Sequence, residues 1–189
     1  MEKLDPQQTA LVLIDLQKGI AAFAGGPHAW LDVAGRAGRL AARFRELGAP
    51  VVLVRVGFSG DGRDALRPLA DQMPPARALP ADWLEYVEEI NAGDGDIHII
   101  KRQWGAFYGT ELELQLRRRG ITRIVLAGVS TNIGVESTAR NAFELGFEQV
   151  LVEDAMSAAN GEHHRFAVEN IFPRLGRVRS TEQVLAALA

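Results

Sequence analysis

The stretch TALVLI at Thr9–Ile14, followed by Asp15, decides the fold of this 189-residue chain. Almost every residue in it is apolar, so both faces of a strand there would be buried. A second run of the same kind, PVVLVRV, occupies residues 50–56, and an amphipathic segment at 34–47 lies between the two runs and stops at Gly48. Strands that are buried on both faces and joined by a helix are typical of a parallel sheet with helices on either side.

The same alternation continues along the rest of the chain. Further strands are predicted at residues 97–100, 124–127, 149–152 and 177–179, and further helices at 111–119, 132–145, 162–171 and 181–188. Right-handed crossovers between them give an α/β fold of three layers, a Rossmann-like doubly wound parallel sheet of about six strands. Residues 57–96 fit least, and we expect a long excursion there with a short helix at 83–90. No break in composition divides the chain, so we expect one domain over residues 1–189.

Composition excludes several classes of protein. Lys and Arg total 21 against 24 Asp and Glu. This formal net charge of −3 lacks the excess of positive charge that is typical of nucleic-acid-binding proteins. The absence of cysteine excludes disulfides, thiolate metal sites and a thiol nucleophile. No secretory leader pattern opens the chain, and no apolar run approaches the length of a membrane span. We therefore expect a cytoplasmic protein that binds a small molecule and neither nucleic acid nor membrane.

Three features follow predicted strands, at the edge of the sheet where ligands bind in open α/β folds. Asp15 follows the first strand, Lys101 the third, and GVSTNIG at residues 128–134 the fourth. A carboxylate at the end of a buried strand is costly unless it has a partner, and Lys101 could supply one. The alternative is that Asp15 only caps a turn and that Lys101 is a solvated charge.

The segment 128–134 opens a helix, and N–H groups at a helix start can hold an anion or a developing oxyanion. Thr131 or Asn132 could equally be an ordinary N-cap. Gly134 leaves room for a ligand near the backbone, although a packing glycine would look the same.

Three other patterns do not predict a site. The glycines of residues 57–62 lack phosphate-loop spacing. His163 and His164 are adjacent on a predicted helix and face different directions, so they are not expected to bind a metal jointly. Ser130 lacks the Gly-x-Ser-x-Gly turn of a nucleophilic serine. We expect neither a metal nor a cofactor.

Three ordered motifs resemble a known family. They are VLIDLQ at residues 12–17, KRQWGAFYGT at 101–110 and GVSTNIGVESTAR at 128–140, and the likeness continues to EDA at 153–155. Together they resemble the isochorismatase-like hydrolases of the cysteine hydrolase superfamily, especially an uncharacterised bacterial branch with glycine in the last motif. The resemblance covers essentially the whole chain.

The resemblance implies a site and a chemistry. The family's aspartate, lysine and cysteine map onto Asp15, Lys101 and Gly134, and the missing cysteine speaks against amide hydrolysis through a thioester. True isochorismatases also lack that cysteine and cleave a vinyl ether without a covalent intermediate, so Asp15 would protonate the vinyl carbon. Lys101 should favour the ionised carboxylate, which keeps open a role for Asp15 as a general base.

The family also implies a cis peptide bond before Ser130. The residues expected to bind the substrate or its oxyanion are Gln17, Trp104, Phe107, Ser130, Thr131 and Ile133, although core packing would equally explain Trp104 and Phe107. The metal-binding motif of the nicotinamidase branch is not evident. The family further implies a homo-oligomer, a dimer or tetramer, with Trp30, Trp83 and Tyr86 as candidate exposed contacts.

Two other interpretations stay open. The chain could be a binding or regulatory protein descended from such enzymes, because the nucleophile is missing. Alternatively, Ser130 or Thr131 could replace the nucleophile.

Overall fold

A six-stranded parallel sheet forms the centre of the computed structural model, which describes residues 3–72 and 78–188. Its strands are β1 (Thr9–Ile14), β2 (Val51–Val56), β3 (Ile97–Lys101), β4 (Arg123–Val129), β5 (Glu148–Ser157) and β6 (Arg177–Arg179). They lie in the order β3-β2-β1-β4-β5-β6, and every neighbouring pair is parallel. This is the doubly wound Rossmann order, and it confirms the predicted fold class.

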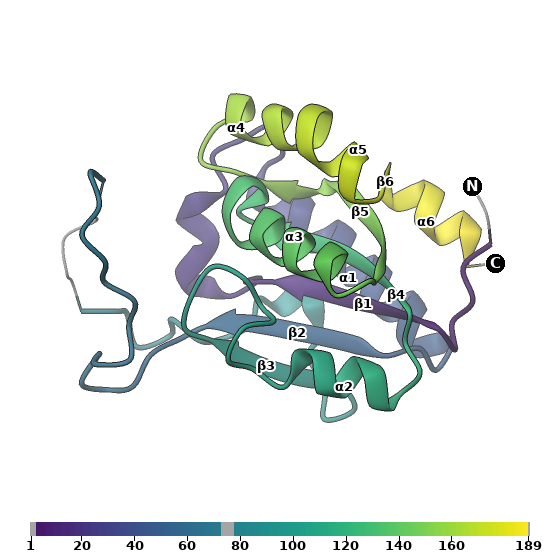
Figure 1. Ribbon diagram of the computed structural model, residues 1–189, viewed down its shortest axis with the longest axis horizontal. Helices are drawn as coiled ribbons and strands as arrows, with labels where there is room; N and C mark the ends of the chain where they lie inside the picture. Colours follow the sequence, from purple (N-terminus) through teal and green to yellow (C-terminus); the bar gives the residue numbers. More distant parts are fainter. Residues whose placement is uncertain (1–2, 73–77, 189) are drawn as a thin grey trace.

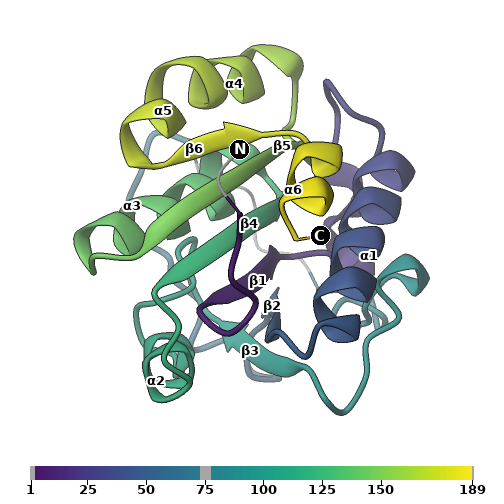
Figure 2. The same ribbon diagram turned by 90° about the vertical axis from the view of Figure 1, so that its right-hand side faces the viewer.

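Helices cover both faces of the sheet (Figures 1 and 2). One face carries α1 (Trp30–Glu46) and α6 (Thr181–Ala187), and the other carries α2 (Leu112–Arg118), α3 (Glu136–Glu144) and α5 (Phe172–Leu175), with α4 (Gly161–Phe166) leading into the last. Each face has its own buried cluster, and β1 serves both. Leu11 and Leu13 point to the α1 side and Val12 and Ile14 to the α2 side, which explains the unbroken apolar run.

No helix among residues 3–72 and 78–188 has the length and apolar character that crossing a membrane requires. The helix from residue 30 begins four positions before the predicted start at 34. The helix predicted at 132–145 starts as a π-helical turn, η3 (Thr131–Val135), and only then continues as α3. The helix predicted at 162–171 is divided into α4 and the π-helical η4 (Ala167–Ile171).

Strand β5 is longer than predicted because it contains a bulge. Leu126 pairs with Leu151 and Gly128 with Met156, so two steps along β4 correspond to five steps along β5. The prediction ended at residue 152 because the charged pair Glu153-Asp154 interrupts the apolar run. A bulge changes the direction of the side chains that it carries, and bulges are common beside functional sites.

The excursion between β2 and β3 extends away from the sheet at the carboxyl end of β2 (Figure 1). The helix predicted at 83–90 is wrong, since only η2 (Glu88–Ile90) is helical. Residues 85–87 instead bond to the segment after β1, where Lys18 N donates to Glu85 O at 2.8 Å and Val87 N to Leu16 O at 3.3 Å. A short 3-10 helix, η1 (Lys18–Phe23), occupies that segment and was not predicted.

The aromatic residues expected as exposed oligomer contacts are not exposed. Trp30, Trp83 and Tyr86 are half-buried and pack against the α1-side core of the same chain. The indole N–H of Trp83 also donates to Val56 O at 2.7 Å. These three residues therefore belong to the packing of the monomer, and the homo-oligomer stays a prediction without them.

Candidate active site

Asp15 lies directly after β1, beside the junction of β1 and β4 where the chain order of the sheet reverses. Such a switch point, outside the carboxyl ends of the strands, is where open α/β sheets bind ligands. The Asp15 backbone has φ +53°, a left-handed conformation that non-glycine residues rarely adopt, and its N–H donates to Val54 O at 2.9 Å. The backbone thus holds the carboxylate in an unusual and defined direction.

Lys101, the last residue of β3, reaches past β2 to this carboxylate. Its Nζ lies 2.8 Å from Asp15 Oδ2 and also donates to Gln103 O at 3.1 Å. Both side chains are buried, at 7% and 2% relative exposure for Asp15 and Lys101. The two strand-end residues that were expected to share one edge of the sheet therefore form a buried ion pair.

Two opposing effects set the pKa of Asp15. Burial raises the pKa of Asp15 to about 6, and this effect exceeds the opposing influence of Lys101 through its charge and hydrogen bond. Lys101 does favour the ionised carboxylate, as expected from its charge, but desolvation raises the pKa by more than Lys101 lowers it. Asp15 Oδ1 is buried and has no hydrogen-bond partner among the described residues.

The turn after β4 approaches β1 very closely. Gly128 has φ +122°, and a Cβ there would collide with Ile14 O, so only glycine fits. The Val129–Ser130 peptide bond is cis. Ser130 O then accepts from Ile133 N at 3.1 Å and from Val135 N at 3.2 Å.

Those two N–H groups are occupied, so the N–H groups of Thr131, Asn132 and Gly134 are the remaining candidates for holding an anion at this turn. Neither residue is an N-cap, since Ser130 holds that position and makes no side-chain capping bond. Ile133 is 37% exposed.

Gly134 faces the ion pair. A Cβ at this position would lie 3.0 Å from Ile14 Cγ2, 3.3 Å from Asp15 Oδ2 and 3.6 Å from Lys101 Nζ. A side chain at position 134 would therefore enter the space beside both charged groups. Because residue 134 is glycine, it places no side-chain atom in the space beside Asp15 and Lys101.

Hydrogen bonds connect the turn to the loop after β3. Thr138 Oγ1 donates to Gly134 O at 2.7 Å and accepts from Ala106 N at 3.1 Å. Gln103 Nε2 donates to Gly105 O at 3.0 Å and to Tyr108 O at 2.6 Å. Thr138 was missed from the sequence because an internal threonine of a helix gives no signal of a contact this distant.

The remaining predicted pocket residues have different surroundings. Gln17 is fully buried, donates to Val56 O and Trp83 O, and accepts from Val56 N. All these bonds go to backbone, which favours a structural role over contact with substrate. Phe107 packs in the core against Phe147, with ring centroids 5.8 Å apart, whereas Trp104 is 65% exposed.

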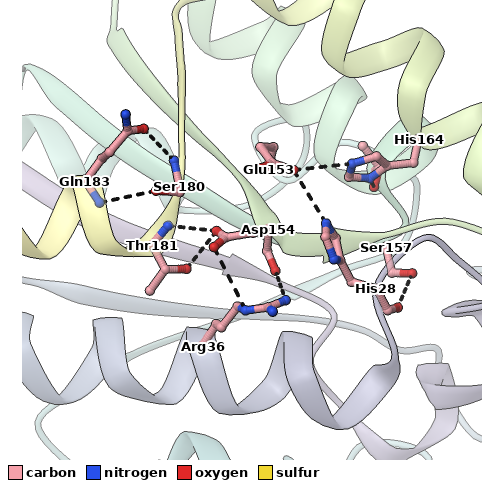
Figure 3. Close-up of polar contacts among 10 residues, drawn as sticks. His28, Arg36, Glu153, Asp154, Ser157, His164, Ser180, Thr181 and Gln183 are labelled. Atoms are coloured by element: carbon pink, nitrogen blue, oxygen red, sulfur yellow. Dashed lines mark hydrogen bonds and ion pairs between the residues drawn. The ribbon is translucent and has the colours of Figure 1, made fainter.

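A second polar cluster adjoins the turn and was not predicted (Figure 3). Thr131 Oγ1 lies 2.9 Å from His164 Nδ1, and both residues are buried. On its other side, His164 Nε2 lies 3.8 Å from Glu153 Oε2, which is also 3.5 Å from His28 Nε2. Burial, followed by the effect of His28, lowers the pKa of His164 to about 4, so its ring is neutral at pH 7.

His163 is exposed while His164 is buried, so the two adjacent histidines do face different directions. Glu153 and His164 stood out in the sequence as part of EDA and of a histidine pair, but nothing there linked them to each other. His28 carried no signal at all. Asp154, next to Glu153, instead anchors α6, since its Oδ1 accepts from Thr181 N at 2.7 Å (Figure 3).

Comparisons with known proteins show which family and which solved structures the chain is similar to. The model of the isochorismatase domain family matches residues 9–183. An uncharacterized isochorismatase family protein of Escherichia coli O157:H7, YecD, is 60% identical over 188 residues, which cover 100% of each chain. A solved isochorismatase family protein from Burkholderia thailandensis is 42% identical and superposes with a TM-score of 0.93, covering 100% of this chain and 98% of that one. The ureidoacrylate amidohydrolase RutB of Methylobacterium radiotolerans is 30% identical over 98% of this chain and 81% of its own.

Proposed function

This chain belongs to the isochorismatase family, whose members are hydrolases, and we propose that it hydrolyses a small carboxylated vinyl ether without a covalent enzyme intermediate. One observation carries the proposal. The buried pair of Asp15 and Lys101 faces Gly134, a position without a side chain, in a chain that has no cysteine. A thioester route has no nucleophile here, whereas acid catalysis needs only the carboxyl group.

The proposed reaction begins with proton transfer from Asp15 to the terminal vinyl carbon. The ether carbon becomes an oxocarbenium ion, water adds to it, and the resulting hemiketal collapses to a ketone and an alcohol. The proton that water loses returns to the carboxylate, so Asp15 ends as it began. For isochorismate, the substrate that the family resemblance implies, the ketone product is pyruvate.

The pKa of Asp15 supports the acid role. With a pKa of about 6, roughly a tenth of the carboxyl groups carry a proton at pH 7 in the free protein. An anionic substrate bound beside Asp15 would raise that pKa further, because a like charge disfavours ionisation. Lys101 and the N–H groups of Thr131 and Asn132 would balance the charge of the substrate carboxylate.

The relative named as a ureidoacrylate amidohydrolase suggests amide hydrolysis as the competing reaction. Without a thiol, water would have to attack the amide directly, with ionised Asp15 as its general base. Loss of the family nucleophile also favours a third possibility, a protein that binds a small acid and does not turn it over.

One experiment separates these functions. Purified protein is offered isochorismate, with pyruvate release followed by coupled reduction, and separately ureidoacrylate, with ammonium release followed. Asp15→Asn is assayed beside Asp94→Asn, the same chemical change in an exposed loop. Pyruvate release that Asp15→Asn abolishes and Asp94→Asn keeps supports the proposal. Ammonium release that needs Asp15 assigns the amide reaction, and saturable binding without either product assigns the binding protein.

A further inference from the structure

We propose that His28, Glu153 and His164 form a binding site for a divalent transition-metal ion of the zinc class. One ligand atom from each residue lies within 4.8 Å of the other two. Two imidazoles and a carboxylate are a donor set that Zn²⁺ and its neighbours in the first transition row accept. The inference concerns binding at this cluster and does not depend on which substrate the protein hydrolyses.

The spacing suits a metal ion. Ligand atoms about 2.1 Å from a tetrahedral ion are roughly 3.4 Å from one another. Glu153 Oε2 lies 3.5 Å from His28 Nε2 and 3.8 Å from His164 Nε2. Small side-chain rotations are enough to bring the three atoms to the distances that a bound ion requires.

One ligand of the cluster is buried and the other two are partly exposed to solvent. The His164 side chain is 5% exposed, whereas those of His28 and Glu153 are 26% and 35% exposed. An ion can therefore enter from solvent and leave one coordination position to water or to a ligand. Three protein ligands with an open fourth position are typical of zinc sites that do chemistry or hold an exchangeable ligand.

The surroundings hold the ligands in place. The ring nitrogen of His164 that faces away from Glu153 is bonded to Thr131 Oγ1 at 2.9 Å, which leaves Nε2 for the ion. Metal-binding histidines usually have such a partner on their other nitrogen. His28 sits on a loop that is bonded to β5, where Ser157 Oγ donates to His28 O at 2.8 Å (Figure 3).

The site would connect the ion to the candidate active site. Thr131 belongs to the turn that offers N–H groups to an anion, and its side chain binds the proposed metal ligand His164. A bound ion would fix the His164 ring and, through it, the position of Thr131. We expect the metal to act on the turn by positioning it.

The test measures metal binding directly. Tag-free protein is stripped with a chelator and titrated with Zn²⁺ against a chromogenic competitor, and the Co²⁺ form is examined for the visible bands of a tetrahedral site. We expect one ion per chain and an affinity that falls more than tenfold in His28→Gln and in Glu153→Gln. Both positions are partly exposed, so these variants should fold even where a change at buried His164 does not.

His163→Gln is the matched control, because His163 is adjacent in sequence and exposed. It should bind Zn²⁺ as tightly as the wild type. The proposal is overturned if wild-type protein binds no stoichiometric ion, or if His28→Gln and Glu153→Gln bind as tightly as wild type. It is also overturned if His163→Gln loses the ion, which would indicate adventitious surface binding. In any of these cases the cluster is a polar contact among β5, α4 and the loop before α1.

Thr131→Val tests the connection to the turn. It keeps the shape of the side chain and removes the hydroxyl that bonds His164 Nδ1. We expect the affinity for Zn²⁺ to fall about tenfold, as is usual when the outer partner of a ligating histidine is removed. Unchanged affinity would overturn the connection. These binding readouts need no substrate, so their failure is distinguishable from failure of the proposed hydrolysis.

Discussion

Lys101 Nζ lies 2.8 Å from Asp15 Oδ2, although Lys101 ends β3, Asp15 follows β1, and β2 lies between these two strands. A buried ion pair contributes little net stability, because desolvating both charges offsets their attraction. Its consequence here is chemical, because burial raises the pKa of Asp15 while the charge of Lys101 lowers it. The pair therefore allows one carboxyl group to occupy both protonation states in the neutral range.

Removing the cation should make stability strongly dependent on pH. In Lys101→Met, Asp15 is buried without a partner, which costs about 3–5 kcal/mol where the carboxyl is charged. At pH 5 the carboxyl accepts a proton and most of that cost disappears. We expect urea unfolding to show a large loss of stability at pH 8 and a much smaller loss at pH 5.

Two further variants control this result. Lys18→Met breaks the exposed pair of Lys18 with Glu85 and should cost far less at both pH values. The double variant Asp15→Asn/Lys101→Met should recover stability at pH 8. Equal losses for Lys101→Met at pH 5 and pH 8 would contradict the coupling.

The raised pKa of Asp15 also predicts how stability changes with pH in the wild type. A carboxyl whose pKa is 3.8 in the unfolded chain and about 6 in the folded one stabilises the fold fully below pH 3.8. That contribution is lost as the pH rises through 6. Relative to Asp15→Asn, which cannot titrate there, the wild type should lose about 2 kcal/mol between pH 4 and pH 7. Chemical denaturation at several pH values measures the difference, and parallel profiles for the two proteins would refute it.

The pH dependence of catalysis should reflect the titration of the Asp15 carboxyl. If Asp15 is the acid, kcat/KM is constant below about pH 6 and falls tenfold for each pH unit above it, because the free enzyme must carry the proton. Initial rates between pH 5 and pH 8 test this. A rate that rises through pH 6 would instead make Asp15 a general base and favour amide hydrolysis.

Much of the fold could be predicted from the sequence because the central strands are buried on both faces. The apolar runs at residues 9–14 and 50–56 favour a parallel sheet that helices cover on both faces. Asp15 and Lys101 could be placed for the same reason, since the ends of parallel strands share one edge. Periodicity failed where tertiary hydrogen bonds decide the backbone, as at residues 85–87, which bond to the segment after β1.

The cluster of His28, Glu153 and His164 could not be predicted. Its members come from a loop, a bulged strand and a helix, and no local pattern joins them. The bulge in β5 decides the direction of Glu153, and a bulge leaves no periodic signal. The raised pKa of Asp15 was missed because it depends on the balance between burial and the charge of Lys101, and the sequence does not give the degree of burial that decides this balance.

Gln17 provides a test of structural against substrate-binding roles. Gln17→Leu leaves the N–H of Val56 without its side-chain partner and removes one donor from the C=O of Val56 and one from the C=O of Trp83, which should cost about 2–3 kcal/mol of unfolding free energy. Limited proteolysis should then cut residues 57–96 faster. Gln8→Leu, an exposed glutamine at the start of β1, should change neither measurement. Unchanged stability with a raised KM would return Gln17 to the substrate site.

Gly134→Ala tests whether the space beside the ion pair is where substrate binds. The added methyl would lie 3.3 Å from Asp15 Oδ2 and 3.6 Å from Lys101 Nζ, so we expect turnover to fall at least about tenfold. Stability should change by no more than about 1 kcal/mol, because the gain from replacing a helical glycine opposes the tight 3.0 Å contact with Ile14 Cγ2.

Gly35→Ala in α1 is the control, since nothing lies within 4 Å of its added methyl. It should be stabilised by roughly 0.5–1 kcal/mol and keep full activity. Full activity in Gly134→Ala as well would mean that substrate does not use this space, and the chemistry would then have to take place on another side of Asp15.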